Sequence, residues 1–122
     1  MLLVVDDEQQ ILMVMKEVLT RQGWKVQGAC DGKEALALFL NYANEIKAVI
    51  TDLCMPYLDG IFLIRALRVL APDLPILVSS AFYDESSQNA LCALQVHRCL
   101  QKPFTARTLS AEVAALFHPH AG

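Results

Sequence analysis

The sequence predicts one α/β domain in which helices cover both faces of a doubly wound parallel sheet. Five short apolar segments alternate along the chain with five longer segments of helical periodicity, the pattern of repeated βα units. The apolar segments are nearly continuous instead of alternating with polar residues, as expected for strands buried on both sides. A length of 122 residues fits a single domain spanning residues 1–122.

The first unit joins a strand at Leu2–Val5 to a helix at Gln9–Arg21. Apolar residues of this helix recur at three- and four-residue spacing and predict a core-facing stripe, made of Ile11, Val14, Met15, Val18 and Leu19. Leu12 and Met13 fall off the stripe and should be partly exposed. Gly23 can adopt the left-handed conformation that ends the helix.

The four later units repeat this order of strand and helix. Their strands are predicted at Lys25–Gly28, Ala48–Thr51, Pro75–Ser79 and Arg98–Gln101. Their helices are predicted at Lys33–Asn41, Ile61–Leu70, Glu85–Leu94 and Ala106–Phe117. Asp31 and Glu34 have the spacing of a capping box, and Thr105 is placed to cap the last helix. Pro72 and Pro75 flank the turn that ends the third helix.

Charged and hydroxyl side chains stand where several predicted strands end. In doubly wound sheets, ligands bind at the carboxyl ends of the strands, so we expect these residues to converge on one site. They are Asp6, Asp7, Asp52, Ser80 and Lys102. Carboxylates without His or Cys partners form a hard oxygen site, which favours Mg²⁺ (or Mn²⁺) over zinc.

Grouped carboxylates repel one another, and a divalent cation together with Lys102 would relieve that repulsion. One of the carboxylates can then act as a nucleophile toward phosphorus and form an acyl phosphate. The metal and Lys102 would stabilise charge on the transferring oxygens, and the Ser80 hydroxyl could donate to one of them. These residue types therefore indicate metal-assisted phosphoryl transfer.

Composition argues against several other classes of function. The net charge of −3 and the dispersed Lys and Arg residues argue against direct nucleic-acid binding. The apolar stretches are far shorter than the ~20 residues that a membrane helix needs, so we expect no membrane insertion by this chain. The 4 cysteines form no CxxC pair, which favours a reducing, cytoplasmic setting.

Four motifs follow one another along the chain: Val4-Val5-Asp6-Asp7-Glu8, Asp52 with Met55-Pro56 and Asp59-Gly60, Ser80-Ala81, and Lys102-Pro103-Phe104. With these motifs in this order, essentially the whole chain resembles the receiver domains of two-component response regulators. The resemblance implies a flavodoxin-like (βα)5 fold, with a five-stranded parallel sheet in the order 2-1-3-4-5.

The resemblance also implies a role for each site residue. Asp52 corresponds to the phosphoacceptor, Ser80 to the switch hydroxyl and Lys102 to the phosphoryl-binding lysine, which precedes a cis proline. The metal would be held by Asp6, Asp7, Asp52 and the backbone carbonyl of Cys54. Leu12 and Met13, together with Pro103 and Phe104, are expected to dock the phosphodonor, a histidine kinase or histidine phosphotransfer domain.

Two departures from the family pattern affect the predicted switch. Cys99 occupies the switch position that is usually aromatic, and Gln95-Val96 replaces the usual Gly-Ala. The face that would be formed by the fourth helix, fifth strand and fifth helix is poor in charge. Dimerisation through this face is therefore not expected.

The implied function is a phosphoaccepting receiver that catalyses its own phosphorylation and dephosphorylation without being a turnover enzyme. Its parent is expected to be a hybrid sensor histidine kinase or a stand-alone regulator. One alternative is a receiver-like interaction domain that no longer cycles phosphate, in keeping with Cys99. Another is an aspartyl-phosphate phosphatase, which would need a second acid at the position of Cys54.

Overall fold

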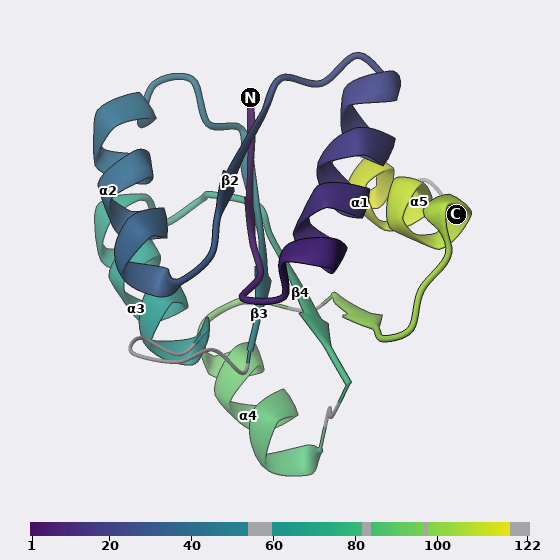
Figure 1. Cartoon of the computed structure of the whole chain (residues 1–122). Helices are drawn as coiled ribbons and strands as arrows, with labels where there is room; N and C mark the ends of the chain where they lie inside the picture. The colour runs from purple at the N-terminus through teal and green to yellow at the C-terminus, as the bar shows by residue number, and fades with distance from the viewer. Residues whose placement is uncertain (54–59, 82–83, 97, 118–122) are drawn as a thin grey trace.

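The computed structural model describes residues 1–53, 60–81, 84–96 and 98–117, and it confirms the predicted fold class and strand order. Five parallel strands form one sheet in the order β2-β1-β3-β4-β5 (Figure 1). The strands are β1 Leu2–Val5, β2 Val26–Ala29, β3 Ala48–Asp52, β4 Ile76–Ser80 and β5 Cys99–Gln101. The helices are α1 Gln9–Arg21, α2 Gly32–Tyr42, α3 Gly60–Leu70, α4 Glu85–Ala93 and α5 Ala106–Phe117.

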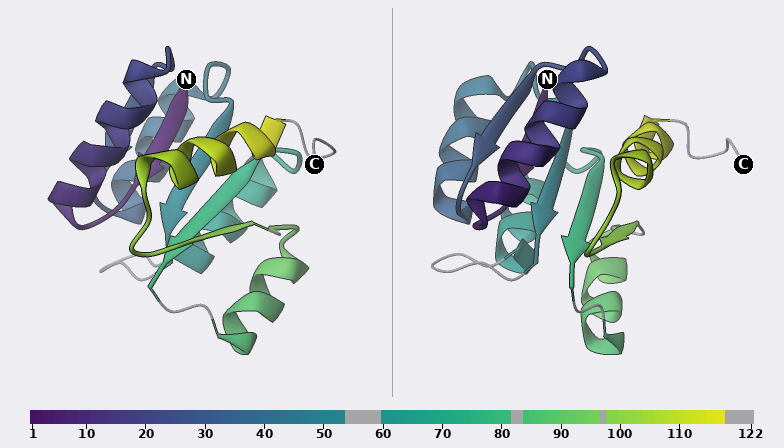
Figure 2. Two further views of the ribbon diagram at one scale, coloured as in Figure 1. Left: turned by 90° about the vertical axis from the view of Figure 1, so that its right-hand side faces the viewer. Right: turned by 45° about the vertical axis from the view of Figure 1, so that its right-hand side comes forward.

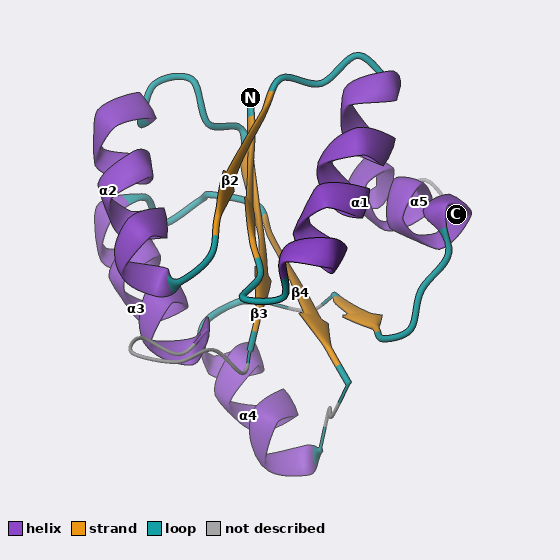
Figure 3. Ribbon diagram, in the orientation of Figure 1, coloured by secondary structure: helices purple, strands orange, loops and turns teal. Residues whose placement is uncertain are grey.

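Helices cover the sheet on both sides, with α1 and α5 on one face and α2 and α3 on the other (Figure 3). Alternate residues of the strands enter two separate core clusters. Leu2 and Val4 pack with Met15 and Leu19 of α1 and with α5, whereas Leu3 packs with α2, α3 and Leu91 of α4. The near-continuous apolar strands of the sequence thus serve two cores, one on each face.

The helix ends use the capping residues that the sequence predicted. The Glu34 amide donates to the Asp31 carboxylate over 2.7 Å, and the Thr108 amide donates to the Thr105 hydroxyl over 3.1 Å. The Glu34 carboxylate accepts from the amide of Cys30, one residue before the cap. Gly23 follows α1 with a φ of 97°, the predicted left-handed stop.

The predicted core-facing stripe of α1 is wrong at Val14, whose side chain is 53% exposed. Met15 and Leu19 are buried as expected, and Met13 is exposed. Leu12 is half-buried because it lies over Gly28 of β2, where an added Cβ would meet Leu12 Cδ1 at 3.3 Å. The missing side chain at Gly28 lets the buried face of α1 turn toward Leu12 and leaves Val14 at its edge.

Gln95 links α4 to β5 in the left-handed conformation, with a φ of 61°. Because a side chain is unfavourable there, Gln95→Gly is expected to raise the free energy of unfolding by about 0.5–1 kcal/mol. Urea denaturation would measure the change. Gln10→Gly, at an exposed position in the first turn of α1, is the matched control and should lower the free energy of unfolding by about 0.5 kcal/mol. A loss at both positions would contradict the expected effect of backbone conformation.

Across the described ranges, no helix combines the length and apolar character needed to span a membrane. The left view of Figure 2 shows the strands broadside behind α1 and α5, with α4 at one end of the molecule. The carboxyl ends of β1, β3 and β4 lie at the same edge of the sheet, because Val5 pairs with Thr51 and Asp52 pairs with Ser79. That edge is where the candidate site residues meet.

Candidate functional site

The pairing of the parallel strands brings two acids and a lysine close together. Asp6 follows the last residue of β1, Asp52 is the last residue of β3, and Lys102 follows the last residue of β5. The Lys102 amide donates to the Ser80 carbonyl over 2.9 Å, which continues the pairing of β5 with β4 past the end of the strand. The Lys102–Pro103 peptide bond is cis, as the resemblance implied.

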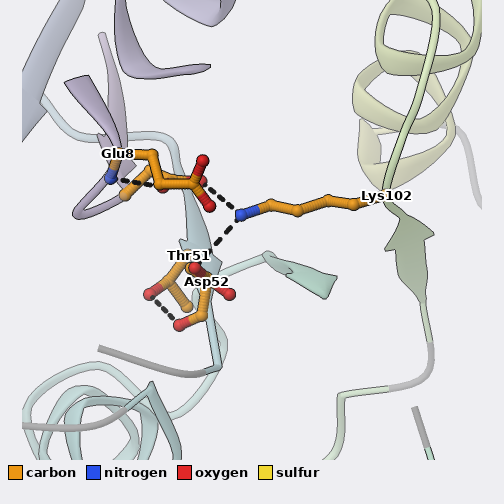
Figure 4. A network of polar contacts seen from close by, with 5 residues as sticks. Glu8, Thr51, Asp52 and Lys102 are labelled. Carbon is orange, nitrogen blue, oxygen red and sulfur yellow. Dashed lines mark hydrogen bonds and ion pairs between the residues drawn. The ribbon is translucent and has the colours of Figure 1, made fainter. Parts of the chain in front are cut away.

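Lys102 bridges the two acids (Figure 4). Its Nζ lies 2.9 Å from Asp6 Oδ2 and 3.1 Å from Asp52 Oδ2, and the three side chains are between 0% and 11% exposed. The Glu8 amide donates to Asp6 Oδ1 over 2.9 Å and fixes that carboxylate, and Thr51 Oγ1 donates to the backbone carbonyl of Asp52 over 3.0 Å. The lysine is therefore held at the junction of two buried carboxylates.

The electrostatics of this junction favour a protonated lysine. Burial alone would lower the pKa of Lys102, but hydrogen bonds to Asp6 and Asp52 and their negative charges outweigh burial and leave that pKa raised. Each buried charge is stabilised by the opposite charge beside it, because water cannot solvate either one. One ammonium nevertheless faces two carboxylates here, so the junction retains excess negative charge.

The carboxylates also have the arrangement that a cation requires. One oxygen from each of Asp6, Asp7 and Asp52 lies within 4.8 Å of the others. Asp6 and Asp52 are buried, while Asp7 is exposed, so an ion between them would keep one open side. Asp6 Oδ2 contacts the Lys102 ammonium, and a carboxylate oxygen keeps a second lone pair with which it can bind a metal. A hard, octahedral ion that retains waters, such as Mg²⁺, fits this donor set.

Of the remaining predicted site residues, Ser80 and Cys99 lie on strands of the sheet, and Cys54 cannot be placed. Ser80 is buried at the end of β4, and its carbonyl accepts from the Lys102 amide. Cys54, the implied carbonyl ligand, lies outside the described residues. Cys99 begins β5 at the end away from Lys102, and burial, with a smaller effect from the Glu112 charge, raises its pKa to about 11. Its thiol is therefore protonated at neutral pH.

An apolar pocket of about 490 Å³ adjoins Lys102 and contains half of the predicted docking residues. Pro103 and Phe104 line it, whereas Leu12 does not and Met13 lines a neighbouring hollow. Ala81 adds to the apolar lining, as do Ile11 and Val14 of α1, which the sequence assigned to the core. Residues that face the core and residues that line a groove at the edge of the core have the same helical spacing. Periodicity therefore could not predict which of these two environments Ile11 and Val14 occupy.

Sequence reasoning also missed the packing role of Gly60. The first turn of α3 lies so close to β3 that a Cβ on Gly60 would sit 2.7 Å from Leu53 Cα and against the Asp52 carbonyl. The Gly60 amide donates to the Leu53 carbonyl over 2.9 Å. An acid followed by glycine is a general turn signal, and the sequence holds no sign that this glycine faces the backbone of Asp52.

Residues 2–114 match the family described as the response regulator receiver domain. The chain is 39% identical to response regulator MprA of Mycobacterium sp. (strain KMS) over 115 residues, which cover 94% of this chain and 49% of that protein. It is 36% identical to transcriptional regulatory protein PrrA of Mycobacterium tuberculosis, covering 93% of this chain and 48% of the other. The chain therefore spans about half the length of these curated relatives.

Solved structures give the same result for the fold. A response regulator receiver domain protein from Clostridium thermocellum superposes with a TM-score of 0.83 at 31% identity, covering 97% of this chain and 94% of that chain. The chemotaxis protein CheY4 of Vibrio cholerae superposes with a TM-score of 0.89 at 27% identity, covering 94% of this chain and 96% of the other. Both likenesses extend over nearly the full length of each chain.

Proposed function

The chain belongs to the response regulator receiver domain family, and on that premise we propose that Asp52 accepts a phosphoryl group in a Mg²⁺-dependent reaction. The observation that carries the proposal is the junction of Lys102 with the buried carboxylates of Asp6 and Asp52. Intact-mass measurement after incubation with acetyl phosphate and Mg²⁺ tests it. The chain should gain one phosphoryl group, and the gain should vanish when the metal is chelated.

In the proposed reaction, a carboxylate oxygen of Asp52 attacks the phosphorus of a phosphohistidine. An O–P bond forms as the N–P bond breaks, and the bonding electron pair leaves with the donor imidazole, which takes up a proton from water. Lys102 would pair with an oxygen of the transferred group, and the Ser80 hydroxyl would donate to another. Asp6, Asp7 and Asp52, with the Cys54 carbonyl, would hold Mg²⁺, which neutralises negative charge on the transferring oxygens when bound.

Lys102 therefore has two successive partners in this proposal. Before transfer, its ammonium offsets the acids, as the short distances to Asp6 and Asp52 indicate. After transfer, the same ammonium would instead pair with a negatively charged oxygen of the phosphoryl group. Because its backbone amide is bonded to Ser80, any movement of Lys102 would also reach β4. We propose that Ser80 and Cys99 relay this movement without an aromatic switch.

The phosphodonor is proposed to be a histidine kinase or a histidine phosphotransfer domain that docks beside the acids. The pocket lined by Ile11, Val14, Pro103 and Phe104 opens next to Lys102, and the 69% exposed Met13 extends its apolar rim. An apolar donor surface seated there would place its phosphohistidine near Asp52. The matching relatives are regulators, which supports a regulator as the parent of this domain.

Met13→Glu is expected to slow phosphoryl transfer from a cognate donor protein roughly tenfold, because a charge would be buried in the apolar interface. Transfer from acetyl phosphate should stay unchanged, since the small donor needs no docking surface. Phosphoryl uptake from each donor, followed over time, measures both rates. Val69→Glu is the matched control, because Val69 is 83% exposed on α3, across the sheet from α1. Equal slowing with both donors would contradict the docking role.

A further inference from the structure

Arg68, in the last turn of α3, donates hydrogen bonds to backbone carbonyls of two other segments. Its Nε donates to the Leu94 carbonyl over 2.8 Å, and its Nη1 donates to the Leu74 carbonyl over 2.6 Å. Its Nη2 lies 3.4 Å from the Gln95 carbonyl, a weaker third contact. Leu74 precedes β4, whereas Leu94 and Gln95 form the turn between α4 and β5. One side chain thus joins α3 to both segments.

The turn that Arg68 holds is the anchored end of a loosely packed helix. Within α4, Leu91 is the buried residue. The Val96 amide donates to the Leu91 carbonyl over 2.8 Å, and the Val96 side chain is buried in the core beside it. The chain reverses at Gln95 in the left-handed conformation. The attachment of α4 is therefore concentrated at its C-terminal end, where the Arg68 contacts lie.

The same turn precedes β5, the short edge strand that ends just before Lys102. This strand has three residues, and its ladder with β4 pairs Val78 with Cys99 and Ser80 with Gln101. A slip of one residue would turn the Lys102 side chain to the opposite face of the sheet, away from the acids. So short a ladder cannot resist such a slip alone, and contacts at both ends of the strand must fix its register.

The two ends of β5 are held by different contacts. At the end near the site, the Lys102 amide is bonded to Ser80. At the other end, the Val78 amide donates to the Arg98 carbonyl over a longer distance of 3.3 Å, and Arg98 forms a partly exposed ion pair with Glu112 of α5 over 3.0 Å, which adds little stability. Arg68 lies beside this end, together with Arg98, along an open pocket of about 360 Å³. The pocket leaves the turn room to move when the Arg68 contacts are removed.

We propose that Arg68 is a positioning residue that tethers the α4–β5 turn and thereby keeps Lys102 in register with Asp6 and Asp52. Arg68 touches none of the three site residues, and it acts through the strand that connects them. The hydrogen bonds to three carbonyls offset the free-energy cost of burying the Arg68 guanidinium. Burial lowers the pKa of Arg68, and the negative charge of Asp73 opposes that effect. A lysine at this position would present one ammonium and could not reproduce the three-way contact.

Amide hydrogen exchange of Arg68→Gln and Arg68→Lys tests the tether directly. In Arg68→Gln, amides of α4 and β5 should exchange about tenfold faster, while those of β1 and β3 keep their protection. Arg68→Lys should recover part of the protection, and Arg65→Gln, an exposed position of the same helix, should change nothing. Uniform acceleration in all strands, or none in α4 and β5 of a folded Arg68→Gln variant, would overturn the proposal.

The effect on Lys102 rests on the proposed function and has its own measurement. The initial rate of phosphoryl uptake from acetyl phosphate should fall several-fold in Arg68→Gln, with partial rescue in Arg68→Lys. An unchanged rate in a variant with faster β5 exchange would overturn the link to Lys102. If the wild-type chain takes up no phosphoryl group, the proposed function fails, and the exchange experiment still decides whether Arg68 tethers the turn.

Discussion

Replacement of Asp52 by asparagine is expected to abolish phosphoryl uptake by this chain while leaving its fold intact. The amide has nearly the shape of the carboxylate, but it is not a nucleophile toward phosphorus and carries no charge for the metal or Lys102. The site holds more negative than positive charge, so removal of one acid relieves repulsion around Asp6. We therefore expect the free energy of unfolding to stay the same or to rise.

Intact-mass measurement after incubation with acetyl phosphate and Mg²⁺ checks this prediction. The wild-type chain should gain a phosphoryl group that is lost on mild alkaline treatment, whereas Asp52→Asn should gain none. Asp73→Asn is the matched control, because Asp73 is an exposed acid at the far edge of the sheet, and it should be phosphorylated normally. Uptake by Asp52→Asn at the wild-type rate would place the phosphoryl group elsewhere and remove the basis of the proposed function.

Gly60→Ala is expected to lower the free energy of unfolding by about 2–4 kcal/mol and to impair phosphoryl uptake as well. The new methyl group would come within 2.7 Å of Leu53 Cα, and backbone atoms cannot yield as a flexible side chain can. The first turn of α3 would have to move away from β3. Since the Asp52 carbonyl borders the same space, Asp52, the proposed phosphoacceptor, would be displaced together with the strand end.

Urea denaturation followed by circular dichroism measures the first effect, and the phosphoryl uptake assay measures the second. Gly23→Ala separates crowding from backbone conformation. Gly23 has a positive φ but nothing within 4 Å of an added Cβ, so that variant should lose about 1 kcal/mol and keep full uptake. A loss at Gly60 no larger than the loss at Gly23 would show that close packing against β3 is not what requires glycine.

Element type and order followed from the sequence because period and composition agree in each segment. The largest boundary error is one residue, as at β2, where the strand runs from Val26 to Ala29 instead of from Lys25 to Gly28. The convergence of Asp6, Asp52 and Lys102 was also predictable, since parallel strands end at one edge and each of these residues stands at such an end. Local pattern and global topology support the same structure here.

The errors concern features that depend on contacts across elements. Val14 has the spacing of a core residue, and its exposure depends on Gly28 of a neighbouring strand, which admits Leu12 instead. Arg68 looks like an ordinary basic residue at a helix end, and its three carbonyl partners come from segments up to 27 residues away. Periodicity describes one element at a time and carries no information about such pairings.

The alternation of the strands between two cores has a consequence for how this domain can evolve. The proposed donor groove, with Ile11 and Phe104, belongs to the core shared by α1 and α5, whereas Leu91 and Val96, beside the tethered turn, belong to the core shared by α2 and α3. The sheet separates the two sets of side chains. Substitutions in the proposed donor groove therefore need not disturb the side chains beside the turn that Arg68 contacts. The two faces of the sheet can therefore change in sequence independently of each other.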